Sequence, residues 1–163
     1  MKTDKAGPRH RRHAKLRTDP ANLDPSSTPV LKGGMPKALG IRVTSLTPKK
    51  VVGEMKITPM HMNVNGRVNG GAIMAFADVL GAAGAVANRP AGFRGGTIES
   101  KTNFFAAGSG PVLSAVSVPL HVGRTTSVWQ TTIRNPDGGL VAMVTQTQIS
   151  VPVSREETGE HRN

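Results

Sequence analysis

The chain has 163 residues, of which 37% are hydrophobic, and this length and composition predict a single domain with one core. It contains no cysteine, so disulfides, thiolate catalysis and cysteine-based metal sites are excluded. Residues 1–37 hold nine Lys or Arg against three Asp and so contribute +6 to the net charge of +11. The remaining domain is mildly basic, which suits an anionic substrate.

The first segment, residues 1–30, is predicted to be a disordered basic tail. It lacks apolar periodicity, contains four prolines and concentrates its charge in the stretch RHRRHAKLR at 9–17. Such a composition cannot bury enough apolar surface to offset the entropy of ordering. The tail has no apolar signal segment, and we expect no run in the chain to approach the roughly 18 to 20 apolar residues of a membrane span. The simplest expectation is a cytoplasmic protein without membrane contact.

Strands are predicted from residue 38 onward, where apolar and polar residues begin to alternate. Two strands are expected at 39–46 and 51–58, with a turn between them. Four more are expected after a long helix, at about 96–105, 112–122, 125–134 and 139–152. Asn, Pro, Asp and Gly at 135–138 supply the turn before the last strand. Residues 153–163 are expected to form a polar C-terminal tail.

The helix is predicted from Gly70 to about Ala87, and its residues are apolar nearly all round, which is typical of a buried helix. Asn69 is a favourable N-cap, because its side chain can accept an otherwise unpaired backbone N–H. Asp78 is the single carboxylate in this run. Burying an unpaired charge is costly, so such a residue is usually kept for chemistry. The alternative is a structural acid that is paired to a backbone donor.

The order of elements, two strands, one long helix and four strands, predicts an α+β domain over residues 38–152. An antiparallel sheet wrapped around the helix would cover its apolar surface. This arrangement is the hotdog fold.

The segment HMNVNGRVNGGAIMAFAD, residues 61–78, resembles the signature of hotdog-fold acyl-CoA thioesterases of the phenylacetate-degradation type. That signature is His-x-Asn-x-x-Gly-x-x-His-Gly-Gly, then six residues and an Asp, and this chain departs from it only where Asn69 replaces the second His. The resemblance continues through 96–108, 121–133 and 138–151. It implies hydrolysis of an acyl- or aryl-CoA thioester to free CoA and a carboxylic acid, without a cofactor.

The helix offers two candidate catalytic groups. Its N-terminus at Gly70 and Gly71 has free N–H groups and the positive end of the helix dipole, so the Gly71 N–H, with that of Gly70, could polarise a thioester carbonyl. Alternatively, the glycines only allow close packing. Asp78 lies roughly 12 Å farther along the helix, too far to act on a carbonyl held at its own N-terminus. Either one assignment is wrong or two subunits share the site. The resemblance implies the second: an obligate homodimer, which can double to a homotetramer, with Asp78 as general base or nucleophile.

The resemblance also assigns roles to two polar residues outside the helix. Thr97 matches the Ser or Thr that assists the water, although Thr is an ordinary strand residue. Asn63 has an amide that could donate to a thioester oxygen or hold a water, and its alternative role is to cap a loop. His61 and Asn69 are expected near the substrate, His61 through a loop hydrogen bond rather than as a base.

Basic side chains are expected to contact the phosphates of CoA. Arg124 matches a position where the family contacts them, and Lys101 and Arg67 are candidate additions. Each of these is, on its own, more commonly a solvated surface charge. No cluster in the sequence indicates a metal site.

Two functions of other classes remain as alternatives. Asn69 removes a group that could titrate near neutral pH, which favours a non-catalytic acyl-CoA-binding hotdog protein. A nucleic-acid-associated function of the basic tail is disfavoured, because stacking aromatic residues and a recognition-helix pattern are lacking. The sequence does not predict the acyl specificity.

Overall fold

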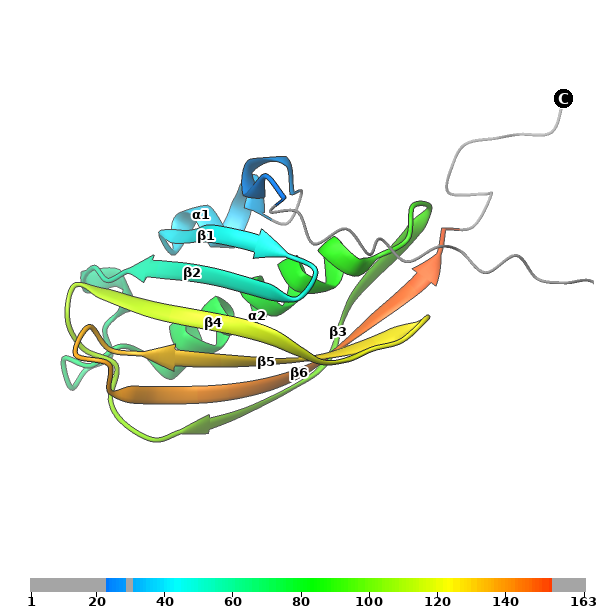
Figure 1. Cartoon of the computed structure of the whole chain (residues 1–163). Coiled ribbons are helices and arrows are strands. Elements are labelled where there is room, and N and C mark those ends of the chain that lie inside the picture. Colours follow the sequence, from blue (N-terminus) through cyan, green and yellow to red (C-terminus); the bar gives the residue numbers. More distant parts are fainter. Residues whose placement is uncertain (1–22, 29–30, 154–163) are drawn as a thin grey trace, which may run out of the picture.

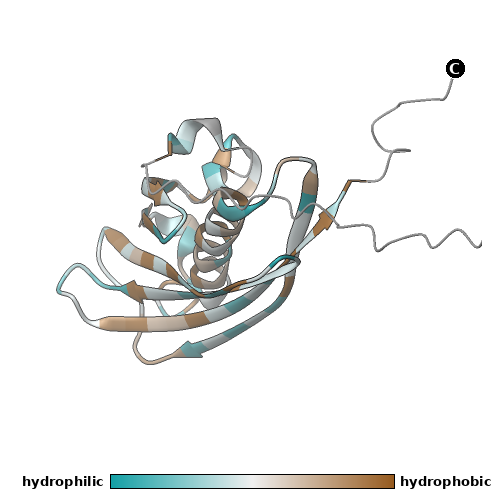
Figure 2. Cartoon of the chain, turned by 45° about the vertical axis from the view of Figure 1, so that its right-hand side comes forward, coloured by the Kyte–Doolittle hydropathy of each residue, from teal (hydrophilic) through white to brown (hydrophobic). Residues whose placement is uncertain are grey.

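The computed structural model describes residues 23–28 and 31–153. Six strands form one antiparallel sheet in the order β1-β2-β4-β5-β6-β3. Their bounds are β1 Ile41–Thr47, β2 Lys50–Lys56, β3 Phe93–Phe104, β4 Val112–Val122, β5 Thr126–Arg134 and β6 Leu140–Pro152. The sheet curves around the long helix α2, Gly70–Asn88 (Figure 1), which lies in the hollow of the sheet (Figure 2). The predicted hotdog fold is confirmed.

Helix α2 lies in the core because most of its side chains are apolar and many of them are small. Ile73, Phe76 and Leu80 are almost fully buried, as is Trp129 on β5. Gly84 allows Trp129 to lie directly against the helix backbone, since a Cβ there would lie 2.5 Å from two carbon atoms of the Trp129 ring. The missing side chain therefore lets the largest core residue pack directly on the helix.

The same helix has the length and composition of a membrane span, which no segment was expected to have. It is 19 residues long with a mean hydropathy of 1.6, and it is the one such helix in the described part of the chain. The fold buries 56% of the apolar window, as is usual for the core helix of a soluble protein. Length and composition alone therefore do not indicate membrane insertion here.

The N-terminal boundary of the domain differs from the prediction. A short 3-10 helix, η1 (Pro25–Ser27), is capped by Asp24, whose side chain accepts from the Ser26 N–H. The Leu23 N–H donates to the Leu46 carbonyl of β1 at 2.7 Å. The predicted disorder is therefore wrong for residues 23–28, while residues 1–22 and 154–163 lie outside the described part.

Two further short helices were not expected from the sequence. They are α1, Gly34–Ala38, directly before β1, and η3, Pro59–His61, between β2 and α2. The domain thus begins before residue 38.

Candidate active site

The carboxylate of Asp78 is fixed by hydrogen bonds from two strands. Its Oδ1 accepts from Thr97 Oγ1 of β3 at 2.7 Å and from Gln146 Nε2 of β6 at 2.8 Å. Gln148 Nε2 in turn donates to Thr97 Oγ1 at 2.8 Å. Oδ2 has no partner among the described residues. The Asp78 partners are thus side chains rather than the backbone donor of the structural alternative, and one oxygen stays free for chemistry.

The two glutamines were not identified from the sequence. On β6, every second residue faces the helix, and Ala142 and Val144 precede Gln146 and Gln148 on that buried face. Burying an amide is costly unless it is hydrogen-bonded, and both Nε2 groups donate within the site. The sequence therefore did contain a signal for these two site residues, namely two glutamines at inward positions of an otherwise apolar strand face.

Asp78 borders a cleft of about 420 Å³, within the usual size range of small-molecule sites. The other lining residues come from α2, β3 and β6: Ala82, Val86, Arg89, Gly95, Gly96, Thr97 and Gln148. Among the described residues, no group of three or more His, Cys, Asp or Glu could hold a metal ion. The cleft therefore combines one fixed carboxylate with an apolar helix face.

Arg89 is the only cation that lines this cleft among the described residues, and it too was not identified from the sequence. It caps the C-terminus of α2. Burial lowers the pKa of its guanidinium, because the charged form loses hydration.

The N-terminus of α2 carries the second predicted group. Asn69 Oδ1 accepts from the Gly71 N–H at 2.7 Å, so the expected N-cap is present. The Gly71 amide, expected to polarise the substrate, is therefore engaged. The Gly70 N–H has no acceptor within the described chain. A Cβ on Gly70 would lie 3.2 Å from the Phe104 ring, so this glycine lets β3 approach the helix end.

Asn63 and His61 are held by contacts in their own loop. Asn63 Oδ1 accepts from the N–H groups of Asn65 at 2.9 Å and Arg67 at 3.1 Å, which is the loop-capping role. Its side-chain nitrogen has no partner among the described residues.

His61 is 2% exposed and does not line the cleft. Its Nδ1 accepts from the Thr58 N–H at 3.0 Å, and its Nε2 lies 3.1 Å from the Leu39 carbonyl, to which it must donate. Through these two contacts His61 ties η3 to the start of β1.

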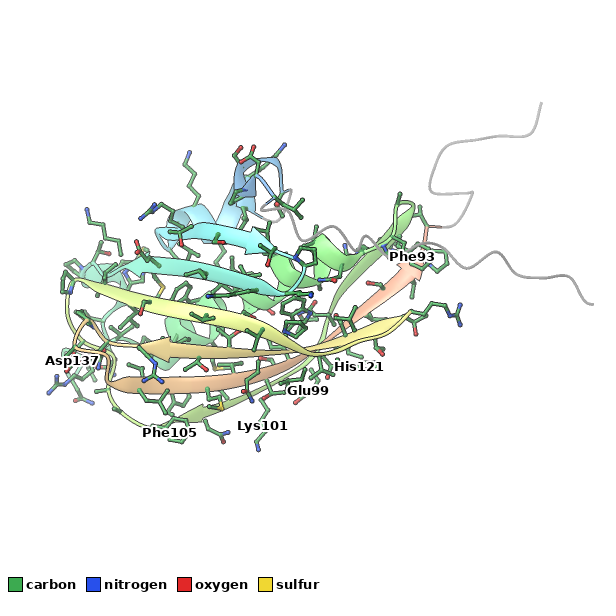
Figure 3. The ribbon with its side chains drawn as sticks, viewed as in Figure 1. Phe93, Glu99, Lys101, Phe105, His121 and Asp137 are labelled. Carbon is green, nitrogen blue, oxygen red and sulfur yellow. The ribbon has the colours of Figure 1, made fainter. Side chains whose placement is uncertain are left out.

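The three predicted CoA contacts do not gather around the Asp78 cleft. Arg67 is exposed in the loop before α2, and Arg124 is exposed in the turn between β4 and β5. Lys101 pairs with Thr145 of β6, on the face of the sheet opposite the helix. Figure 3 shows Lys101 extending away from the open edge of the sheet. A contact from any of them to CoA remains a prediction.

Comparison with known proteins agrees with this geometry. Residues 65–142 match the model of the thioesterase superfamily. A candidate esterase of Vibrio cholerae is 25% identical over 122 residues, which cover 75% of this chain and 79% of that protein.

Solved structures share the fold. A thioesterase family protein from Silicibacter pomeroyi matches with a TM-score of 0.71 and 22% identity, covering 75% of this chain and 92% of that chain. A hypothetical thioesterase from Streptococcus pneumoniae, solved with coenzyme A, matches with a TM-score of 0.63 and 26% identity, covering 69% and 86%. The matched segment contains Asp78 and Thr97, and its similarity to the thioesterase superfamily agrees with the predicted thioester hydrolase.

Proposed function

We propose that this protein hydrolyses acyl-CoA thioesters and that Asp78 is the general base. The observation that carries this proposal is the carboxylate at the cleft, with Oδ1 held by Thr97 and Gln146 and Oδ2 free. A preoriented carboxylate can take a proton from a water without reorganising at the moment of reaction. The relative from Streptococcus pneumoniae that was solved with coenzyme A supports CoA as the carrier.

In the proposed reaction, a water in the cleft gives a proton to Asp78 Oδ2 while its oxygen attacks the thioester carbonyl carbon. The tetrahedral intermediate then expels the CoA thiolate, which receives the proton from Asp78. Thr97 donates its only hydroxyl proton to Asp78 and accepts a hydrogen bond from Gln148. It has no further proton to donate to the water, so we assign it a positioning role.

The oxyanion is proposed to be stabilised by the N-terminus of α2 from a second copy of the chain. Asp78 is roughly 12 Å from the N-terminus of its own helix, so a second copy must supply the donor. The Gly70 N–H fits this role because it is open, whereas Gly71 must first be released by Asn69. Two open features beside the cleft support the dimer: β3 is an edge strand exposed over most of its length, and Met74 on α2 is 40% exposed.

A tetramer is a further proposal, supported by apolar side chains on the outer face of the sheet. Val116, Val118 and Leu120 of β4 are exposed on the side away from α2. Exposed apolar surface of this kind commonly marks an interface between proteins. Light scattering at micromolar concentration measures the assembly directly, and a monomer would contradict both the dimer and the shared site.

The variant Asp78→Asn tests the general base. It is nearly isosteric, so the fold and acyl-CoA binding should persist while turnover falls at least about a hundredfold. Thiol release followed with a dye gives the rate, and the melting temperature and calorimetric CoA-ester binding serve as controls. Unchanged turnover in a folded variant would rule out Asp78 as the base.

Mixing two inactive variants tests the sharing of the site. Asp78→Asn protomers and Gly71→Val protomers should regain activity when mixed, since each heterodimer holds one site built from the two unmodified elements. Samples verified to contain heterodimers that stay inactive, with both parents folded, would show that the site is not shared.

A non-catalytic acyl-CoA-binding protein is the second candidate, and the engaged amide of Gly71 is the observation that favours it. Binding of CoA esters without thiol release would support this alternative. Asn69→Ala would then be informative, because removing the cap frees the Gly71 N–H, and a gain of hydrolysis would show that the amide had been blocked.

A further inference from the structure

Arg89 is a partly buried cation without a partner among the residues that the structure describes. Its guanidinium makes no hydrogen bond or ion pair with any described residue, and its Nε is buried. Burying an uncompensated charge is costly, and the desolvation that lowers the pKa of Arg89 reflects this cost. An arginine at a helix C-terminus interacts favourably with the negative end of the helix dipole, but a solvent-exposed guanidinium would have the same interaction. The burial therefore calls for a ligand that enters the cleft.

The position of Arg89 defines one end of the cleft. Asp78, Ala82, Val86 and Arg89 follow one another along one side of α2, and roughly 16 Å of helix axis separates the backbone positions of Asp78 and Arg89. The segment between them is apolar, so methylene groups or a ring can lie along it. A Cβ on Gly95 would lie 3.1 Å from Nη2 of Arg89, so the glycine gives the guanidinium room beside β3.

We propose that Arg89 binds a carboxylate at the far end of the acyl group, so that the preferred substrates are thioesters of dicarboxylic acids. This inference rests on the proposed function, in which Asp78 acts on the thioester at the other end of the cleft. The planar guanidinium matches a carboxylate through two parallel hydrogen bonds, and such a pair is strongest where water is excluded.

The phosphates of CoA are the other anions that Arg89 could bind. The nucleotide end of CoA carries several phosphates, whereas Arg89 is the only cation among the described residues that line the cleft. The apolar surface of Ala82 and Val86 suits an acyl chain better than the amide-containing arm of CoA. A single carboxylate on an aliphatic or aryl chain therefore matches the cleft in both charge and polarity.

The test compares suberyl-CoA with octanoyl-CoA, which differ only in the terminal carboxylate. The wild type should hydrolyse suberyl-CoA with the higher kcat/KM. Arg89→Met, which keeps the length without the charge, should lower that value roughly 10- to 100-fold, as expected for loss of a hydrogen bond to a charged group, and leave octanoyl-CoA unchanged or improved. Arg89→Lys should retain part of the preference. Arg134→Met, an exposed arginine on β5, is the matched control and should change neither substrate.

Equal losses for both substrates in Arg89→Met, with weaker inhibition by free CoA, would assign Arg89 to the phosphates and overturn the inference. A wild type with no preference for suberyl-CoA would overturn it too. If the wild type hydrolyses neither ester, the proposed function fails, and the Arg89 site is then tested by calorimetry with suberate and octanoate. Binding of suberate alone, lost in Arg89→Met, would support the site independently of catalysis, and absence of suberate binding would refute it.

Discussion

Gly81, in the middle of α2, gives the Gln146 side chain the space to reach Asp78. A Cβ at this position would lie 2.2 Å from Oε1 and 3.1 Å from Cδ of Gln146. These atoms are the end of a flexible side chain and not backbone, so Gly81→Ala should be accommodated by rotation of Gln146. That rotation withdraws Nε2 from Asp78 Oδ1, which it now contacts at 2.8 Å.

Two effects of opposite sign determine the stability of Gly81→Ala. Alanine stabilises a helix interior by roughly 1 kcal/mol relative to glycine. Loss of a hydrogen bond to a charged group costs roughly 1.5 to 3 kcal/mol. The free energy of unfolding should therefore fall by roughly 0.5 to 2 kcal/mol. Turnover should fall about tenfold or more, because Asp78 keeps only its bond from Thr97 and loses its fixed orientation.

Introducing Gly81→Ala into the Gln146→Ala variant separates the gain in helix propensity from the loss of the hydrogen bond. Once the glutamine is absent, the added methyl group has no side chain to displace, so Gly81→Ala should now stabilise the protein by roughly 1 kcal/mol. Urea unfolding of the wild type, the two single variants and the double variant measures this reversal, and thiol release measures turnover in parallel. The same destabilisation in both backgrounds would refute the reasoning.

Three more changes probe the helix, the site and the N-terminal segment. Gly84→Ala should destabilise by roughly 1 to 3 kcal/mol or more, because the rigid ring of Trp129 cannot rotate away as Gln146 can; an unchanged melting temperature would contradict this packing. Thr97→Val should lower kcat with little change in KM, whereas Thr97→Ser keeps the hydroxyl and should keep most of the activity; equal losses in steady-state kinetics would argue against positioning through the hydroxyl. Deleting residues 1–22 should leave the urea midpoint unchanged, and deleting 1–28 should lower it, because η1 and its flanks pack on β1; equal midpoints would show that this contact contributes nothing.

Much of the fold could be predicted because its signals are local. The apolar run of α2 and the alternation in the six strands gave bounds within a few residues of those observed. η1 and α1 are too short for periodicity to show, although Asp24 followed by Pro25 is a recognisable start of a helical turn.

The site was predictable only in part, because its contacts depend on strand register. Asp78 and Thr97 were expected from the resemblance, and they meet at 2.7 Å. Their partners on β6 depend on the pairing of Thr97 with Gln148, which no local pattern determines. Arg89 was missed for a related reason, since its place in the cleft depends on the tertiary contact that brings Gly95 and Gly96 of β3 beside the end of α2.

The register irregularity in β3 explains how one strand serves both ends of α2. Thr97 faces Asp78, and Phe104 faces Gly70, although seven positions separate them and a regular strand would point them to opposite faces. Thr97 pairs with Gln148 and Glu99 with Thr147, so Ile98 is an extra residue that restores the alternation. Because of this bulge, the strand can orient the carboxylate at one point and pack on the helix N-terminus at another. In the proposed dimer, each shared site therefore depends on β3 of both protomers, one strand orienting Asp78 and the other packing on the helix N-terminus.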